Sequence, residues 1–294
     1  MRTDGGECWE CKVKGNFRLK GIRSTNPVAI GDWVTFLPEP DGAALITSID
    51  DRRNYVIRKA TNLSKQSHII AANVDQCLLI VTIAEPETTT TFADRFLASA
   101  EAYRIPVTLV INKSDLLDTE ERQSLLRQWL DIYRHIGYDC ITTSALTGDG
   151  MVRLRQMLGG KVTLLSGHSG VGKSSLINRL FPDLHLKTAE ISDAYHTGKH
   201  TTTFSEMFPV DDSSYIIDTP GIKGFGTFDF ERSEVSHFFK DIFKVSADCR
   251  FGDCTHTHEP GCAVVRAVEE GVIASSRYES YLNMLDDKDE EKYR

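Results

Sequence analysis

One short segment constrains the fold of this chain more than any other. Residues 167–174 read Gly-His-Ser-Gly-Val-Gly-Lys-Ser and fit the pattern G-x-x-x-x-G-K-[ST], which holds a phosphate between a strand and a helix. An apolar run at residues 162–166 precedes the segment, and a helical pattern at residues 175–180 follows it. Both flanks agree with a phosphate-binding loop, and an ordinary Gly-rich turn explains them less well.

The residue types of this loop define the contacts that we expect. Backbone N–H groups at the helix N-terminus bind phosphate oxygens. The Lys173 ammonium neutralises the β- and γ-phosphates and is a candidate catalytic group, and the Ser174 hydroxyl binds Mg²⁺. The predicted nucleotide-binding residues here are Gly167, Ser169, Gly170, Val171, Gly172, Lys173, Ser174 and Ser175.

A second motif indicates which base is bound. Asn112, Lys113 and Asp115 follow an apolar, strand-like run and fit the pattern N-K-x-D of GTPases. The Asp115 carboxylate can accept hydrogen bonds from N1–H and the 2-amino group of guanine, a pair of donors that adenine lacks. Ser144 and Ala145 follow the next strand-like run, where GTPases place a loop that touches guanine O6. The alternative is a loop before a helix, with Asp115 as its N-cap.

Two further segments complete a GTPase site. Asp218 and Gly221 fit D-x-x-G, in which the Asp holds Mg²⁺ through water and the Gly N–H contacts the γ-phosphate. Between this motif and the phosphate loop, residues 200–203 read His-Thr-Thr-Thr, and we expect Thr202 to offer its hydroxyl to Mg²⁺ and to be a candidate catalytic residue. Taken alone, each segment also fits a turn or a strand edge. The predicted magnesium ligands are Ser174, Thr202 and Asp218.

The order of the motifs is informative. A Ras-like GTPase begins with the phosphate loop, whereas here N-K-S-D and the Ser144-Ala145 pair precede it. We therefore expect a circularly permuted P-loop GTPase domain over residues 66–230, rejoined near residues 146–161. Its strand-like runs alternate with helices, which predicts an α/β fold with a mostly parallel sheet. The helical patterns lie at residues 92–103, 119–136 and 151–158.

Residues 1–65 have short strand-like runs separated by Gly and Pro, which predicts a small β-barrel. Both an OB-type and an SH3-like barrel fit this spacing. Only four runs are present, at residues 11–20, 33–37, 44–49 and 55–58. Because an OB fold has five strands, we expect the chain to begin inside or just after the first strand of such a fold. Alternating cations form either a nucleic-acid-binding face or a solvated outer face: Lys12, Lys14, Arg18, Lys20 and Arg23.

The sequence of residues 231–294 predicts a third module, which we expect to be helical and to bind zinc. Cys249, Cys254, His256 and Cys262 supply three thiolates and one imidazole, the ligand set of a closed tetrahedral zinc site. His258 is the competing imidazole. The helical patterns lie at residues 234–243, 263–270 and 277–285.

Composition excludes several classes of protein. The chain has 294 residues, of which 40% are apolar and 26% charged, and its net charge of −8 argues against nucleic-acid binding over the whole surface. No apolar run is long enough to span a membrane and the start lacks a secretion signal, so we expect a cytoplasmic protein with no membrane partner. Seven cysteines favour free thiols and metal ligands over disulfides. Cys8 and Cys11 are interpreted as ordinary barrel cysteines, with metal or redox chemistry as the alternative.

Together these motifs resemble the RsgA (YjeQ) family of small-subunit ribosome biogenesis GTPases. The resemblance covers essentially the whole chain and rests on the nucleotide motifs, the zinc spacing and a barrel segment with Gly31 and Asp32. It implies an OB-fold N-terminal domain, a low GTPase activity stimulated by the small ribosomal subunit, and a role late in the maturation of that subunit. We expect this sequence to depart from the family at its start, where the first barrel strand would lack a counterpart.

One catalytic position differs from Ras-like enzymes. Ile222 follows D-x-x-G, where those enzymes carry a Gln that positions water. His200, close to the predicted magnesium ligand Thr202, is the nearest candidate to replace it and matches a His of the resembled family. A surface histidine is the alternative.

The sequence thus predicts a monomeric GTP hydrolase that uses GTP or GDP, Mg²⁺ and one Zn²⁺. We expect its flanking domains, residues 1–65 and 231–294, to bind the small ribosomal subunit and its rRNA. Two alternatives are a GTP-dependent RNA-binding switch with incidental hydrolysis, and a P-loop ATPase or kinase of a small metabolite. Asp115 argues against the second of these.

Overall fold

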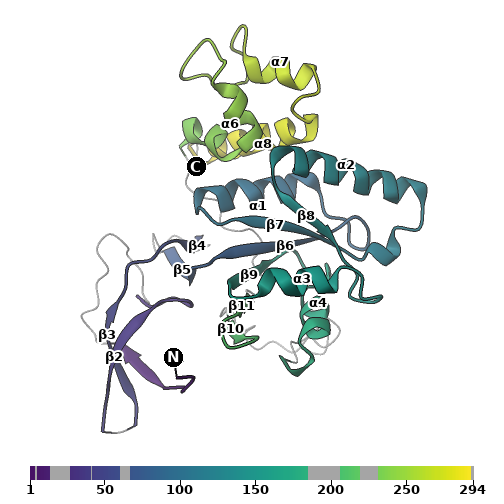
Figure 1. Ribbon diagram of the computed structural model, residues 1–294. Helices are drawn as coiled ribbons and strands as arrows, with labels where there is room; N and C mark the ends of the chain where they lie inside the picture. The colour runs from purple at the N-terminus through teal and green to yellow at the C-terminus, as the bar shows by residue number, and fades with distance from the viewer. Residues whose placement is uncertain are drawn as a thin grey trace.

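The computed structural model describes residues 1–3, 5–13, 27–40, 42–59, 67–184, 206–218 and 231–292. Figure 1 shows three parts: a small group of N-terminal strands at one side, a central sheet with helices on both faces, and a helical C-terminal module beyond one of the helical layers.

The central sheet has six strands in the order β10-β11-β9-β6-β7-β8. Neighbouring strands are parallel except for the antiparallel pair β10–β11 at one edge. Every residue of β6 and β7 is buried, as expected of strands covered on both faces, and this explains their continuous apolar sequences. The strands are β6 (Gln76–Thr82), β7 (Val107–Asn112), β8 (Asp139–Thr142), β9 (Val162–Ser166), β10 (Glu206–Pro209) and β11 (Tyr215–Asp218).

Helices pack on both faces of this sheet (Figure 1). On one face, α1 (Thr90–Ala102) and α2 (Glu120–Ile136) share a core with alternate residues of β6, among them Leu79. On the other face, α3 (Met151–Leu158) and α4 (Lys173–Leu180) share a second core with residues such as Leu78. Because alternate side chains of a strand point to opposite faces, the central strand β6 contributes to both cores. Two 3-10 turns, η1 (Ser114–Leu116) and η2 (Pro182–Leu184), follow β7 and α4.

The N-terminal part contains five strands among the described residues, one more than the sequence predicted. Three form a sheet in the order β1-β3-β2, and β4 and β5 form a separate two-stranded hairpin. The strands are β1 (Cys11–Val13), β2 (Val34–Pro38), β3 (Ala44–Ile49), β4 (Tyr55–Lys59) and β5 (Ser67–Ala72). Most of the predicted cationic strand, including Lys14, Arg18, Lys20 and Arg23, lies outside the described residues.

The β4–β5 hairpin connects this part to the central domain. Val56 of β4 and Ala71 of β5 are fully buried in the core beneath α1 and α2. The Ala72 N–H donates to the Ile30 carbonyl at 2.8 Å, and the Gly31 backbone passes so close that a Cβ there would lie 2.1 Å from the Ala72 carbonyl oxygen. Only glycine fits at this position, where φ is also positive at 87°.

The C-terminal module consists of η4 (Arg232–Phe238), α6 (Lys240–Ser246), α7 (Ala263–Glu269) and α8 (Ser275–Lys292). The prediction of one helix over residues 234–243 is wrong, because a 3-10 turn and a short helix meet at Phe239, whose backbone is extended. The Phe239 ring is fully buried and packs edge-on against Tyr281 at a centroid distance of 5.6 Å. The Phe239 ring therefore packs in the core at the residue where the helical pattern is broken, and tertiary packing overrides helix propensity there.

A buried ion-pair cluster joins this module to the central domain. The Arg277 guanidinium of α8 donates to Asp94 of α1 at 2.8 Å and to Asp241 of α6 at 2.9 Å. Ser280 and Tyr133 also donate to the Asp94 carboxylate, at 2.7 and 2.9 Å. Burial raises the pKa of Asp94, although Arg277 and these hydroxyls counteract the shift. Removing any one of these charged side chains would therefore take a counter-charge away from at least one buried charge.

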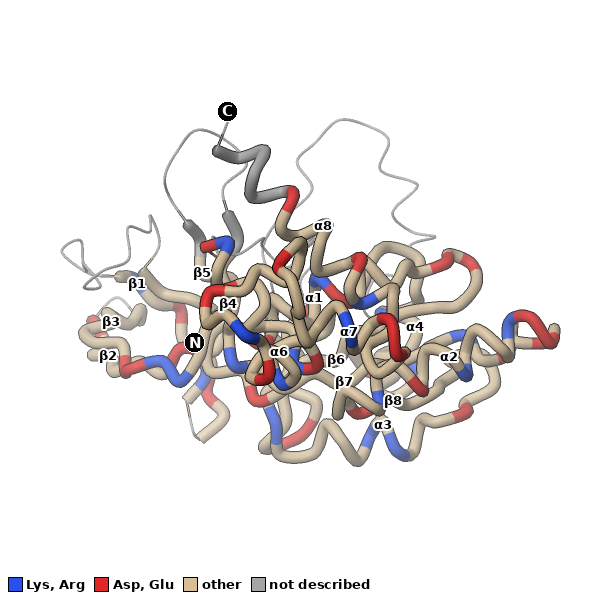
Figure 2. The backbone as a smooth tube through the Cα atoms, turned by 90° about the horizontal axis from the view of Figure 1, so that it is seen from above, with Lys and Arg blue, Asp and Glu red and all other residues tan. Residues whose placement is uncertain are grey.

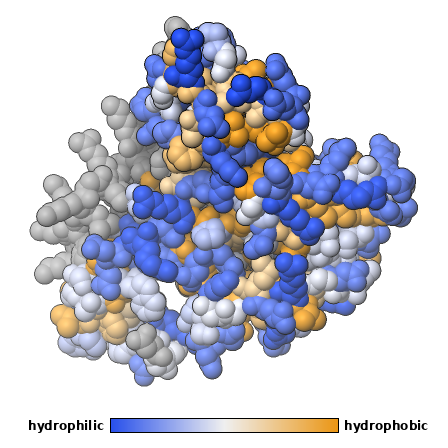
Figure 3. Space-filling model, turned by 45° about the horizontal axis from the view of Figure 1, so that its top comes forward, coloured by the Kyte–Doolittle hydropathy of each residue, from blue (hydrophilic) through white to orange (hydrophobic). Residues whose placement is uncertain are grey.

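Lys and Arg residues are interspersed with Asp and Glu residues along the described chain (Figure 2). Hydrophilic side chains cover most of the face seen in Figure 3, with smaller apolar areas between them. None of the described helices has the length and hydrophobicity needed to cross a membrane. The most exposed large apolar side chains come from separate elements and include Trp33, Leu37, Leu146, Val152 and Phe243.

We predict that Arg277→Met lowers the free energy of unfolding by about 3–5 kcal/mol, because it leaves Asp94 and Asp241 without their counter-charge. Urea unfolding followed by circular dichroism measures this difference. Arg266→Met, an exposed position on α7, is the matched control and should change the free energy by less than about 0.5 kcal/mol. Equal losses in the two variants would contradict the role assigned to the cluster.

Candidate nucleotide-binding site and metal centre

The predicted nucleotide motifs follow the carboxyl ends of neighbouring parallel strands. Ser166 at the end of β9 pairs with Leu79 of β6, and Asn112 at the end of β7 pairs with Thr82. In the same way Thr142 at the end of β8 pairs with Ile111 of β7. The phosphate loop, the N-K-S-D motif and the Ser-Ala loop therefore meet at one edge of the sheet, where ligands bind in open α/β folds.

Two glycines hold the phosphate loop against its neighbours. Gly167 has φ of 141°, and a Cβ there would lie 2.3 Å from the Ile80 carbonyl oxygen of β6. Gly172 has φ of 91°, and its Cβ would lie 2.5 Å from Asn112 Nδ2. Any larger residue at either position would force the loop away from β6 and from the N-K-S-D motif. Helix α4 then begins at Lys173 and carries Ser174 and Ser175 in its first turn.

The Lys173 ammonium lies over the same loop. It donates to the carbonyl oxygens of Gly167 at 2.6 Å and His168 at 2.9 Å. Burial lowers the pKa of Lys173, and the nearby negative charge of Asp218 opposes that shift. The structure therefore brings Lys173 close to Asp218, which ends β11 beside the phosphate-loop strand.

Asn112 connects three loops of the site. Its side-chain Nδ2 donates to the Val171 carbonyl of the phosphate loop at 2.8 Å. Its Oδ1 accepts from the Thr143 hydroxyl, at the end of β8, at 3.1 Å. Both side chains are buried, so these hydrogen bonds are shielded from water. The amide thus joins the predicted base-binding motif to the predicted phosphate-binding loop.

Asp115 lies beside the Ser-Ala loop. The Ser144 hydroxyl donates to Asp115 Oδ1 and accepts from the backbone N–H groups of Leu146 at 3.2 Å and Thr147 at 3.0 Å. This contact orients the Asp115 carboxylate next to Ser144 and Ala145. The alternative role of Asp115 as a helix N-cap is wrong, because Thr119 caps α2 and Asp115 lies inside η1.

The loop after β6 also contributes to this edge, which the sequence did not indicate. Thr88 Oγ1 lies 2.6 Å from His168 Nε2, and the Lys113 ammonium donates to the Glu85 carbonyl. Thr143 was likewise missed. The only signal for these residues was their position directly after apolar strands whose ends meet at the site.

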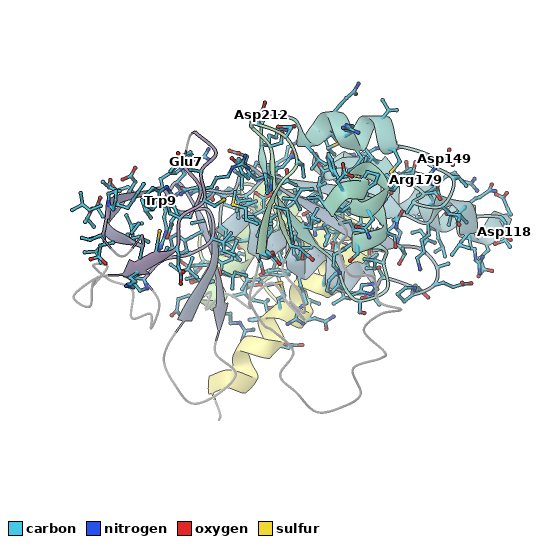
Figure 4. All side chains as sticks on the ribbon, turned by 90° about the horizontal axis from the view of Figure 1, so that it is seen from below. Glu7, Trp9, Asp118, Asp149, Arg179 and Asp212 are labelled. Carbon is cyan, nitrogen blue, oxygen red and sulfur yellow. The ribbon has the colours of Figure 1, made fainter. Side chains whose placement is uncertain are left out.

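Three of the remaining predicted site residues cannot be located in the described part of the chain. His200, Thr202 and Gly221 lie outside the described residues. The guanidinium of Arg179 on α4 lies near Gly148 in the loop after Ala145, where a Cβ would be 3.1 Å away. Figure 4 shows Arg179 beside Asp149 on this side of the molecule. Helix α4 therefore contacts the Ser-Ala loop as well as the phosphate loop.

The four predicted zinc ligands form one cluster in the C-terminal module. Their ligand atoms all lie within 4.8 Å of one another, in Cys249, Cys254, His256 and Cys262. His256 Nδ1 lies 3.6 Å from Cys249 Sγ and 3.5 Å from Cys262 Sγ. Separations of about 3.5–4 Å are expected in a tetrahedral zinc site with metal–ligand bonds of about 2.0–2.3 Å. The donor set and its spacing therefore fit one Zn²⁺.

The competing histidine does not belong to this cluster. His258 is exposed, and its Nδ1 lies 2.8 Å from the Thr257 hydroxyl. His256 is buried, and its left-handed backbone, with φ of 57°, turns its ring toward the cysteines. Cys8 and Cys11 join no group of three or more candidate metal ligands among the described residues.

Hydrogen bonds from outside the cluster support this loop. The Glu259 carboxylate accepts from the backbone N–H groups of Thr255 at 2.7 Å and Thr257 at 3.0 Å. Burial raises the pKa of Glu259, but the hydrogen bond from the Thr255 hydroxyl at 2.6 Å, together with these backbone N–H groups, outweighs it and holds the pKa well below its usual range. The Tyr278 hydroxyl of α8 donates to the His256 carbonyl at 2.6 Å. The ligand loop is therefore anchored to α8.

Comparison with known proteins identifies relatives over the whole chain. The family model described as RsgA GTPase matches residues 49–228, and the RsgA N-terminal domain model matches residues 2–46. A protein of Bacteroides fragilis strain YCH46 named small ribosomal subunit biogenesis GTPase RsgA is 62% identical over 294 residues, covering all of this chain and 94% of that protein. A protein of the same name from Porphyromonas gingivalis strain W83 is 58% identical, covering 99% of this chain and 94% of its own length.

Two solved structures have the same fold. The crystal structure of YjeQ from Thermotoga maritima matches with a TM-score of 0.76 and 36% identity over 96% of this chain and 91% of that one. The structure of YloQ, described as a circularly permuted GTPase, matches with a TM-score of 0.74 and 30% identity over 99% of this chain and 90% of that one. The predicted permuted fold is thereby confirmed, and the chain belongs to the RsgA GTPase family.

Proposed function

We propose that this protein hydrolyses GTP and acts on the small ribosomal subunit during its biogenesis. The observation that carries the proposal is the hydrogen bond from Asn112 to Val171, which sets a guanine-type motif directly against a phosphate-binding loop. A site for phosphates alone would not need this connection. The names of relatives that match the whole chain support the biological role.

In the guanine half of the site, Asp115 accepts from N1–H and the 2-amino group of the base. Its contact with the Ser144 hydroxyl supports this role, since that contact orients the carboxylate. Asn112 holds the motif in place through its hydrogen bond to Val171. Lys113 would belong to the base-binding residues, and the backbone at Ala145 would contact O6.

In the phosphate half, the N–H groups of the loop from Gly167 to Gly172 bind the phosphate oxygens, together with the Lys173 ammonium and the first turn of α4. Ser174, Thr202 and Asp218 would hold Mg²⁺, which neutralises charge on the β- and γ-phosphates when bound. Gly221 would contact the γ-phosphate, and His200 would orient the attacking water. The neighbourhood of Asp218 and Lys173 supports this arrangement.

The flanking parts serve the partner. We infer a division into residues 1–65, 66–230 and 231–294, with the outer two binding the subunit and its rRNA, and a protein that acts as a monomer in the cytoplasm. One Zn²⁺ held by Cys249, Cys254, His256 and Cys262 would stabilise the C-terminal module without taking part in hydrolysis, because all four positions are filled by protein.

The function is tested by measuring turnover of GTP and ATP with and without purified small ribosomal subunits. We expect turnover of GTP but not ATP, and stimulation by the subunits. His200→Ala should lose most of this stimulation with GTP affinity unchanged, because its role arises in the transition state. Equal turnover of the two nucleotides would contradict the function, whereas stimulation that survives His200→Ala would exclude only that residue.

Asp115→Asn tests the guanine assignment. It should weaken GTP binding by about 2 kcal/mol or more and improve binding of xanthosine triphosphate, because the amide donates where the carboxylate accepted. Titration with fluorescent analogues of both nucleotides measures this change in nucleotide preference. Asp118→Asn, an exposed carboxylate shown far from the N-terminal strands in Figure 4, is the control. An unchanged nucleotide preference in Asp115→Asn would refute the assignment.

Elemental analysis tests the metal centre. We expect one Zn²⁺ per chain, its loss in Cys254→Ala, and its retention in His258→Ala, because only the first residue belongs to the cluster. Loss of zinc should also lower the melting temperature, since binding free energy in such sites contributes to folding. A wild-type protein without zinc after purification in the absence of chelators would contradict the site.

A further inference from the structure

The loop between β6 and α1, residues 83–89, contacts both halves of the nucleotide site. On the phosphate side, the Thr88 hydroxyl is hydrogen-bonded to the His168 ring. Pro86 packs against Gly170, where a Cβ would lie 3.3 Å from Pro86 Cδ. On the guanine side, the Glu85 carbonyl accepts from the Lys113 ammonium. No nucleotide motif includes this loop, yet it is in contact with two of them.

The contact between Thr88 and His168 has a defined direction. Thr88 is buried, and its Oγ1 accepts from the Thr82 N–H at 3.0 Å and lies 2.6 Å from His168 Nε2. An Nε2 that accepts requires the proton of the neutral ring on Nδ1. His168 Nδ1 lies 3.1 Å from the Ser169 carbonyl and donates to it. Because a carbonyl oxygen can only accept, Nδ1 carries the proton of the neutral ring, and the Thr88 hydroxyl donates to Nε2.

The His168 ring is also held by packing. The Phe92 ring of α1 meets it edge-on, with a centroid distance of 5.5 Å. The backbone carbonyl of His168 accepts from the Lys173 ammonium at 2.9 Å. Fixing the side chain of His168 therefore also fixes a carbonyl that holds the phosphate-binding lysine, and the Ser169 carbonyl at the turn of the loop.

We propose that Thr88 and His168 are positioning residues for the phosphates of GTP and GDP. The Thr88 hydroxyl holds His168, and His168 holds the phosphate loop in the conformation that receives a nucleoside diphosphate or triphosphate. The inference rests on the proposed function, because it requires that the loop binds a nucleotide. Neither side chain needs to touch the ligand, so the effect appears in affinity rather than in the chemical step.

Removal of the Thr88 hydroxyl tests the proposal. Thr88→Val keeps the shape of the side chain and removes its proton, whereas Thr88→Ser keeps the hydroxyl. We expect Thr88→Val to raise the Kd for GDP and the KM for GTP about fivefold, the effect of one lost hydrogen bond, with kcat unchanged. Thr88→Ser should restore both values. Thr47→Val is the matched control, because it removes a Thr hydroxyl that also donates one hydrogen bond, to the Thr35 carbonyl, but that lies in β3.

A double-mutant cycle tests whether Thr88 acts on GDP affinity through His168, and the melting temperature tests whether it acts only on the stability of the fold. Because the two residues act through one hydrogen bond, Thr88→Val combined with His168→Ala should bind GDP no more weakly than His168→Ala alone. Additive losses, or Thr88→Val binding like the wild type, would overturn the proposal. A lower melting temperature in Thr88→Val with unchanged Kd would show a structural role only, and would also overturn it. A wild type that binds no GDP would instead refute the proposed function.

Discussion

The side-chain amide of Asn112 is the contact on which the nucleotide site depends. The strands that carry the two main motifs, β9 and β7, are not neighbours, since β6 lies between them. The Asn112 amide spans this gap to reach Val171, and its oxygen is bonded to Thr143. A buried amide without partners would be strongly unfavourable, so the three loops keep these positions together. Gly172 is required by the same contact, because a Cβ would displace the amide.

This constraint explains why the order of the motifs along the chain can change while the site persists. The site is made at one edge of a parallel sheet, and it depends on which strands are neighbours rather than on which strand comes first. Permutation instead changes what is attached to the domain. The β4–β5 hairpin leads directly into the central strand β6, and the Arg277 cluster docks the C-terminal module on α1, the helix that follows β6. Both flanking parts are therefore connected through the centre of the sheet.

Much of the central domain could be predicted because its patterns are strong. The bounds of β9 and α3 agree with the sequence, since an uninterrupted apolar run and a clear amphipathic stripe leave few alternatives. Strand β5 was missed because Ser67–Ala72 shows no alternation, and β10 because it is a short edge strand ending in Pro. The spacing pattern correctly predicted His256 as the zinc ligand but left His258 as a competitor, which the positions of the two side chains exclude.

Motifs specify the atoms that meet a ligand, but the geometry of those atoms is held by residues at variable positions. His168 occupies an unspecified position of the phosphate loop, and its restraint comes from Thr88 in another loop. The zinc cluster is built in the same way. The left-handed backbone of His256 costs about 1–2 kcal/mol, and the hydrogen bond from Tyr278 to its carbonyl helps to offset that cost. Because Tyr278 adjoins Arg277 on α8, the helix that shapes the metal site also anchors the module to α1, whose first turn contacts the phosphate loop.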